Sequence, residues 1–199
     1  MPDVRLSAPV DTTLSRREQI VNTAAELFAE RGYHGVTIEE LGTAVGISGP
    51  GIYKHFASKQ AVLAEMLISI SNHLLAGGRR EIEAAASPSD ALNRLVSFHT
   101  DFALTRPELI RVQEHDLANL STSEAREVRR LQRAYVELWV AVLHEIDPEL
   151  SLLEARTRAH AVFGLLNSTP HSAPTDNPLA GVVLRQMARA ALAIRAIEL

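Results

Sequence analysis

Three residues that carry or can gain a positive charge stand close together in the first third of the chain. Lys54 and Lys59 are the only lysines in the sequence, and His55 lies between them. Residues 41–64 around them contain no Asp or Glu, although the whole chain has a formal charge of −4. A local cationic surface on an acidic protein is suited to hold the phosphates of a nucleic acid. The sequence therefore points first to DNA binding in this stretch.

The histidines do not predict a metal or catalytic site. They show no H-x-x-x-H or H-E-x-x-H spacing. Glu114, His115 and Asp116 are consecutive, but neighbours on a helix point about 100° apart and cannot close one coordination sphere. The chain has no cysteine, no G-x-S-x-G elbow and no glycine-rich phosphate loop. We therefore expect no metal, no cofactor and no enzymatic activity.

Two short helices must present the cationic stretch. Thr37 begins a capping box, and Gly46 supplies the left-handed residue that ends this first helix. Ser48 caps the second helix, which we expect to run to Phe56 with Pro50 tolerated in its first turn. Two helices joined by a glycine turn allow the second to lie in a DNA major groove. A helical hairpin that only packs is the alternative.

Residues 27–63 closely resemble the N-terminal domain of the TetR (tetracycline-repressor) family of one-component bacterial regulators. The matching positions keep the family's spacing: Phe28, Gly32, Gly35, Thr37, Ile38, Ala44, Gly46, Ser48, Ile52, Tyr53, His55, Phe56, Lys59 and Leu63. Together with the helix before it, the resemblance covers about the first third of the chain. It implies a helix-turn-helix headpiece, a C-terminal bundle that binds small effectors, and dimers that pair through their two C-terminal helices.

The DNA-binding surface has three groups of expected contacts. The resemblance implies phosphate contacts from Thr37, Ser48, Tyr53, His55 and Lys59. Lys54 is the only long cationic side chain on the second helix, so we expect it to read bases, and Gly49 to face the DNA beside it. Arg16 and Arg17 lie in the first turn of the preceding helix, where cations oppose the helix dipole. A phosphate is one interpretation of their partner, and solvation is the other.

Serine caps divide the rest of the chain. Capping boxes begin helices at Ser15 and Ser121, and Ser58 and Ser87 cap two others. Gly77-Gly78 weakens the helix that follows Ser58. Asp147-Pro148 and Asn177-Pro178 precede the last two helices. With a short helix after Pro107, the pattern predicts nine helices, no strand and one irregular segment at residues 169–177.

We therefore expect an all-α protein with two lobes. Residues 1–14 form a flexible arm, residues 15–57 the DNA-binding domain, and residues 58–199 the ligand-binding and dimerisation domain. No apolar run approaches the length of a membrane span, and the N-terminus lacks a hydrophobic signal core, so a cytoplasmic location is expected.

The inward faces of the helices between Ser87 and Thr169 combine apolar and a few polar residues. This set is His99, Phe102, Val112, Trp139, Leu143, Phe163 and Asn167. Such residues either complete an ordinary core or, as the resemblance implies, line an effector cavity. If they line a cavity, its composition suits a small hydrophobic or acyl-bearing ligand.

The last two helices carry apolar stripes with small residues. We assign to a dimer interface Ala159, Val162, Leu166, Val183, Gln186, Met187, Ala190 and Ile194. Packing within one chain is the alternative, and the resemblance favours the dimer. The predicted function is a ligand-released repressor that binds a palindromic operator as a homodimer. The alternative is a helical small-molecule-binding or scaffolding protein whose headpiece no longer reads DNA.

Overall fold

The computed structural model describes residues 14–172 and 177–193, and these residues form helices and turns without a strand. The elements in chain order are α1 (Arg16–Arg31), η1 (Tyr33–Gly35), α2 (Ile38–Ala44), α3 (Gly49–Ile52), α4 (Lys59–Glu83), α5 (Pro88–Thr105), α6 (Pro107–Asp116), η2 (Leu117–Asn119), α7 (Thr122–Ile146), α8 (Leu152–Leu166), α9 (Thr169–Ser172) and α10 (Ala180–Ala193). The nine predicted helices are α1 to α8 and α10. The additional α9 is a single turn inside the segment that the sequence predicted to be irregular.

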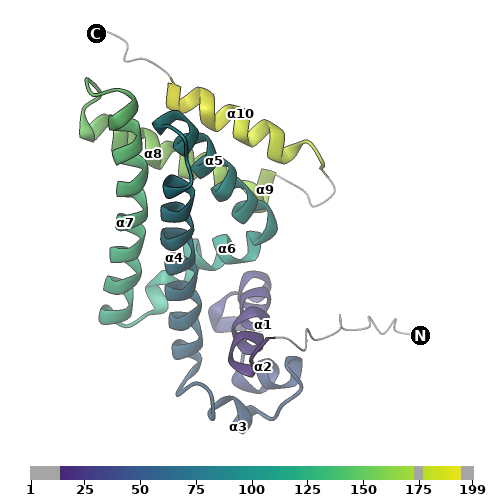
Figure 1. Ribbon diagram of the computed structural model, residues 1–199. Coiled ribbons are helices and arrows are strands. Elements are labelled where there is room, and N and C mark those ends of the chain that lie inside the picture. The colour runs from purple at the N-terminus through teal and green to yellow at the C-terminus, as the bar shows by residue number, and fades with distance from the viewer. Residues whose placement is uncertain (1–13, 173–176, 194–199) are drawn as a thin grey trace.

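The helices form two lobes joined by α4. Figure 1 shows α1, α2 and α3 as a small headpiece at one end and α5 to α10 gathered around the other part of α4. In the body α4 packs against α5 and α7, and α10 packs on α5 and α8. The headpiece is held to the body by α4 and by a second contact, in which α1 packs on α6.

Side-chain caps fix most helix starts where the sequence placed them. Ser15, Thr37 and Ser121 form complete capping boxes with the glutamates three residues later. Ser58 and Ser87 accept from the backbone N–H groups of Ala61 and Asp90. These bonds satisfy N–H groups that have no partner inside a helix, so short local patterns were sufficient to predict them.

The prediction for the start of α8 was wrong. Asp147 is instead the C-terminal cap of α7, and Pro148 lies in the turn that follows. The cap of α8 is Ser151, whose hydroxyl accepts from Glu154 N–H at 3.2 Å. Both segments offer a capping side chain, and the packing of Leu150 into the core places the turn between them.

The glycine pair in α4 has the opposite role to the expected one. The helix continues through Gly77 and Gly78 to Glu83. A Cβ at Gly77 would lie 2.1 Å from Phe98 Cζ, and one at Gly78 would lie 2.7 Å from Tyr135 Cε2. These glycines therefore let α5 and α7 approach α4 closely, and the packing gained outweighs their low helix propensity.

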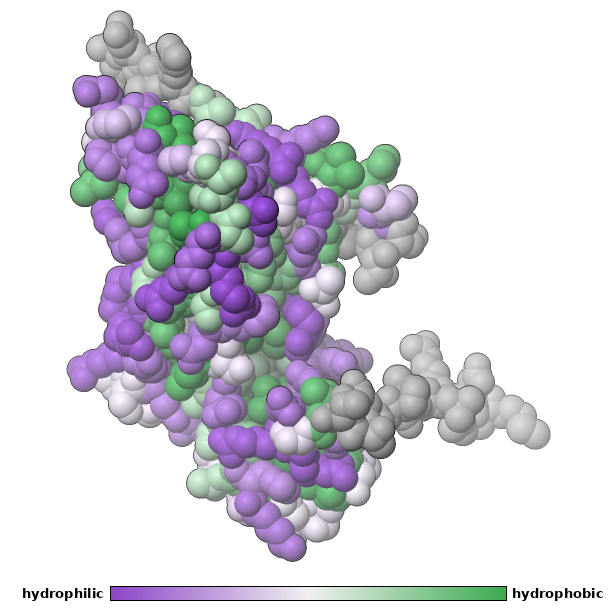
Figure 2. Space-filling view, in the orientation of Figure 1, coloured by the Kyte–Doolittle hydropathy of each residue, from purple (hydrophilic) through white to green (hydrophobic). Residues whose placement is uncertain are grey.

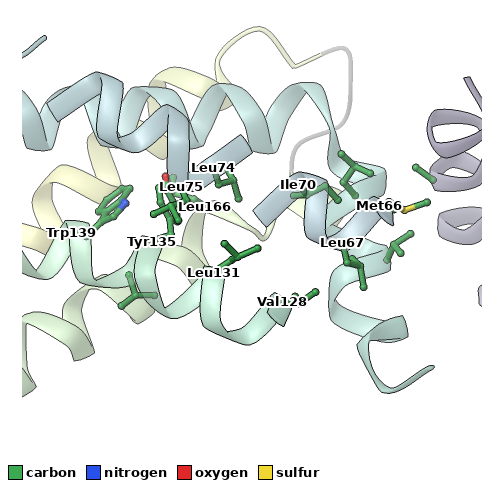
Figure 3. Packing of buried hydrophobic residues seen from close by; sticks show 14 of the residues in the cluster. Met66, Leu67, Ile70, Leu74, Leu75, Val128, Leu131, Tyr135, Trp139 and Leu166 are labelled. Atoms are coloured by element: carbon green, nitrogen blue, oxygen red, sulfur yellow. The ribbon is translucent and has the colours of Figure 1, made fainter. Parts of the chain in front are cut away.

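One hydrophobic cluster extends from the headpiece through the body. Figure 3 shows it from Met66 and Leu67 near the headpiece to Tyr135 and Trp139 at the far end of the view. By length and composition α4 could cross a membrane, but 61% of its apolar window is buried inside the fold. Its hydrophobicity is therefore that of a central core helix.

Candidate functional site

The α2–α3 unit is held together by tight backbone packing. Gly46 has a φ of +72°, which ends α2 in the left-handed region as predicted. The Ser48 hydroxyl then accepts from Gly51 N–H at 3.2 Å and starts α3. A Cβ at Gly42 would lie only 2.9 Å from the Ile47 carbonyl oxygen. Gly42, which the sequence reasoning missed, thus permits the close crossing of the two helices.

The second helix is shorter than predicted. The regular part of α3 ends at Ile52, and Tyr53, Lys54 and His55 lie in the turns that follow. Pro50 and two glycines supply little helix propensity in this stretch. Burial of Ile52 and Phe56 nevertheless fixes the chain, so the intervening residues are turned outward.

Two side chains form the exposed tip of this unit. Tyr53 is 55% exposed, and the exposed side chain of Lys54 makes no hydrogen bond or ion pair with the described residues. The ammonium group of Lys54 can therefore approach a nucleic acid without giving up an internal partner. In Figure 2 the outer end of this lobe is mainly hydrophilic.

Gly49 does not belong to the exposed surface. It is buried, and a Cβ there would meet Glu39 Cγ at 3.3 Å. Its expected place facing DNA is therefore corrected: Gly49 provides room for the side chain of Glu39 on α2. Sequence spacing placed it on the outer face of the second helix, but α2 packs against that side of Gly49 through Glu39.

Arg16 and Arg17 make contacts within the headpiece. Arg16 Nη1 donates to the Val45 carbonyl at 3.0 Å, at the end of α2. Arg17 Nη1 donates to the His55 carbonyl at 2.6 Å, and Arg17 Nη2 pairs with Glu65 at 3.1 Å. The guanidinium carbon of Arg17 also lies 4.1 Å from the centre of the Phe56 ring. Neither interpretation from the sequence included this arrangement, in which the arginines brace the α2–α3 unit against α1 and α4.

Lys59 is also engaged inside the headpiece. Its Nζ donates to the carbonyls of Val36 at 2.7 Å and Tyr33 at 2.8 Å, and it lies 4.2 Å from the centre of the Tyr33 ring. Two of its three N–H donors are thereby used. This geometry fits a residue that fixes the segment between α1 and α2, and the predicted phosphate contact stays a prediction for the third donor.

Among the other predicted phosphate contacts, Thr37 and Ser48 use their hydroxyls in helix caps. Thr37 Oγ1 donates to Glu40 Oε2 at 2.9 Å, and the backbone N–H of Thr37 donates to the same oxygen at 2.8 Å. That backbone hydrogen bond is the main reason why the pKa of Glu40 is lowered. Both residues are exposed, and His55 is half-buried.

A cavity of about 210 Å³ lies in the body among α4, α5, α6, α7 and α8. Three of the predicted ligand residues, His99, Phe163 and Asn167, line it. The ring of His99 is fully buried, and this burial lowers the pKa of His99 to about 4. His99 Nε2 lies 3.0 Å from Asn167 Oδ1, and His99 Nδ1 lies 3.3 Å from the Tyr135 hydroxyl.

The structure disperses the other predicted ligand residues. Phe102 lines a separate cavity between headpiece and body, and Leu143 lines one near the end of α10. Val112 is core, and Trp139 is fully buried behind the cavity wall, with its ring centre 4.9 Å from that of Phe163. Sequence reasoning missed Ser71, Gln113, Gln132 and Tyr135 in the wall. Tyr135 stands four residues before Trp139, which is a signal that could have placed both on one face.

The proposed dimer residues fall on two different surfaces. Ala159, Val162 and Leu166 of α8 are buried in the body's own core, so their assignment to an interface is corrected. On α10, Val183, Gln186, Met187 and Ala190 are exposed, whereas Ile194 lies outside the described residues. Apolar periodicity identified the buried face of α8, because both an interface and a core select the same residue types.

Comparison with known proteins agrees with both lobes. The sequence profile for bacterial regulatory proteins of the tetR family matches residues 20–66, and that for a tetracyclin repressor-like C-terminal domain matches residues 85–171. The HTH-type transcriptional repressor KstR2 of Rhodococcus jostii is 31% identical over 166 residues, which cover 76% of this chain and 81% of KstR2.

Two solved structures have the same fold over nearly their whole length. A TetR-family transcriptional regulator from Bordetella parapertussis has a TM-score of 0.82 at 21% identity, and covers 92% of this chain and 96% of its own. AibR, solved in complex with isovaleryl coenzyme A and operator DNA, has a TM-score of 0.72 at 18% identity, and covers 88% of this chain and 97% of its own.

Proposed function

This chain belongs to the TetR family and is a DNA-binding transcriptional regulator, and we propose that it is a dimeric repressor released from its operator by a small ligand. The observation that carries the proposal is the α2–α3 unit, whose tip exposes Tyr53 and Lys54 on an acid-free stretch. The surrounding hydrogen bonds hold this tip in one conformation before DNA arrives. Such preorganisation lowers the entropic cost of binding.

Dimerisation supplies the second recognition unit. Leu179, Val182, Val183 and Met187 are large apolar residues exposed along α10 and just before it, and Leu152 and Leu153 are exposed at the start of α8. Figure 2 shows an apolar patch at the N-terminal end of α10. An apolar surface of this kind favours a partner, and we propose a second copy of the chain. The outward face of α8 then replaces the buried residues first assigned to the interface.

A dimer imposes a geometry on the operator. The two α2–α3 units must reach major grooves one DNA turn apart, about 34–36 Å. Because the two copies are related by twofold symmetry, the operator should be a near-palindrome. Lys54 is our proposal for the base-reading residue, and Tyr53, Thr37, Ser48 and His55 for phosphate contacts.

The effector site is the cavity lined by His99, Phe163 and Asn167. Its partly apolar wall suits a small hydrophobic or acyl-bearing ligand, and an acyl-coenzyme A is present with AibR, which shares the fold. The ligand must favour a conformation with poorer half-site spacing in order to release DNA. Two routes connect the lobes: α4, and the contact of α6 with the headpiece.

The contact of α6 with the headpiece has specific polar bonds. Asp116 Oδ1 accepts from Tyr33 N–H at 3.4 Å, and Asn119 Oδ1 lies 2.8 Å from His34 Nε2. Burial raises the pKa of Asp116. A shift of α6 caused by the ligand would therefore act on the same segment, residues 33–36, that Lys59 holds.

A mobility-shift experiment tests the function directly. The protein should bind DNA from its own upstream region as a dimer, and its affinity should fall steeply as the salt concentration rises. A panel of small acyl and apolar compounds should contain ligands that raise the melting temperature and lower the DNA affinity together. Salt-independent binding, or no preference for upstream DNA over random DNA, would contradict the proposal.

A further inference from the structure

The cavity in the body has an uncharged wall. Ten residues line it, and none is an Asp, Glu, Lys or Arg. Its polar side chains are amides, hydroxyls and imidazoles, and one imidazole, that of His99, is fully buried and neutral at pH 7. His160 stands at the exposed rim, where water screens its ring. An ion that reached the buried end of this cavity, beside His99, would therefore lose hydration without gaining a charged partner.

The hydrogen bonds behind the wall run in one direction. Burial raises the pKa of the Tyr135 phenol, so its hydroxyl keeps its proton and needs an acceptor. The phenol O–H therefore donates to His99 Nδ1, its only partner at hydrogen-bond distance among the described residues. In the reverse direction the buried phenol proton would have no acceptor.

This direction determines what Asn167 presents to the cavity. Neutral His99 accepts at Nδ1, so it carries its proton on Nε2 and donates to Asn167 Oδ1 at 3.0 Å. The Asn167 amide NH₂ then has no partner in the described part of the chain. The amides of Gln113 and Gln132 in the same wall also make no hydrogen bond to described residues. The cavity therefore offers donors that an occupant can satisfy.

We propose that the effector enters this cavity with an uncharged hydrogen-bond acceptor, such as a carbonyl oxygen, which accepts from Asn167, and that the corresponding carboxylate is excluded. This inference rests on the proposed function, because it assigns a ligand class to the effector site. The apolar frame of the ligand packs on Phe163, Leu74 and Val136. An acyl group fits when it is an ester, amide or thioester, and does not fit as a free acid.

Two fragments of equal shape test the charge preference. Cyclohexanecarboxamide and cyclohexanecarboxylate differ in charge at neutral pH, where the acid is ionised. Trp139 is the only tryptophan of the chain and adjoins the cavity wall, so its fluorescence reports occupancy. We expect the carboxamide to bind at millimolar concentration at least about tenfold more tightly than the carboxylate.

Matched variants test the role of Asn167. Asn167→Asp keeps an acceptor for His99 but removes the two donors, and should weaken carboxamide binding by about fivefold or more. Asn72→Asp makes the same change at an exposed position of α4 and should have no effect. Far-UV circular dichroism verifies the fold of both variants, and the comparison of fragments on the unmodified protein does not depend on either.

Three results would overturn the inference. These are equal or tighter binding of the carboxylate, no fluorescence response to the carboxamide, and an unchanged carboxamide affinity in Asn167→Asp. The experiment contains no DNA, so each of these results leaves DNA binding by the headpiece intact. Conversely, a protein that binds no DNA can still show the expected fragment preference.

Discussion

The tip of the headpiece and the cavity of the body are opposite kinds of recognition site. The tip is exposed and cationic, and its working side chains project from two turns of chain. The cavity lies among five helices, and no Asp, Glu, Lys or Arg lines it. The tip suits a polyanion that keeps much of its hydration, whereas the cavity suits a neutral molecule that loses it. The two sites can therefore share one chain without competing for ligands.

Separating the two copies should cause the largest loss of operator affinity. A monomer can bind the operator with only one tip, although the tip and the cavity of each chain are unchanged. Met187→Asp places a charge on the exposed apolar face of α10 and should dissociate the dimer. Loss of the second half-site should then lower operator affinity by about 100-fold or more. Sedimentation velocity and mobility shift measure the two effects.

Ala76→Asp, on the exposed side of α4, is the matched control and should leave both unchanged. A monomeric Met187→Asp protein that still bound DNA normally would contradict this prediction. One tip would then be sufficient, and the body would not contribute to DNA affinity.

Low pH should lower the unfolding free energy because His99 is buried in the neutral form. The pKa of His99 is lowered from 6.5 to about 4 in the folded protein, so the unfolded chain binds more protons between these values. The stability that neutral His99 contributes to the folded protein is fully present above about pH 6.5 and is lost as the pH falls toward 4. The loss amounts to about 3 kcal/mol of unfolding free energy.

Urea unfolding followed by Trp139 fluorescence, at one protein concentration and several pH values, measures this loss. His99→Gln should flatten the difference between neutral and acidic pH, whereas His115→Gln, on the exposed side of α6, should retain it. The same acid dependence in His99→Gln would show that other groups cause it.

The two lysines of the headpiece should respond differently to the same substitution. Lys59→Met removes two charge-assisted hydrogen bonds to backbone carbonyls and should lower the unfolding free energy by about 2 kcal/mol. The slope of log affinity against log salt should stay unchanged if Lys59 makes contacts only within the headpiece. A decrease of that slope by about one unit per half-site would indicate that the third donor of Lys59 also contacts a phosphate.

Lys54→Met is the matched change at the exposed tip and should have the smallest energetic effect. Stability should stay constant, because Lys54 has no partner among the described residues. Discrimination at one base position should fall by about 1 kcal/mol, at the low end of the usual range, since the ammonium of a lysine lacks the rigid planar fork of an arginine. Binding measured on operators changed one base pair at a time checks this. A uniform loss across all sequences would indicate a phosphate contact instead.

Residues close together in the chain were sufficient to predict most helix starts and the DNA-binding unit. The serine and threonine caps, Gly46, and the burial of Ile52 and Phe56 depend on residues a few positions apart, where local geometry leaves little choice. The family resemblance was confirmed because its motif lies in this locally specified region.

Which residues share a site could be seen only in the folded chain. Lys59 is bound to carbonyls more than twenty residues away, and His99 meets Asn167 across sixty-eight positions. The apolar face of α8, which the sequence analysis assigned to a dimer interface, is part of the core. Gly77 and Gly78 allow close packing of α5 and α7 on α4. Periodicity shows that a face is apolar, but the partner of that face is set by how the helices cross. That crossing depends on contacts between residues far apart in the chain.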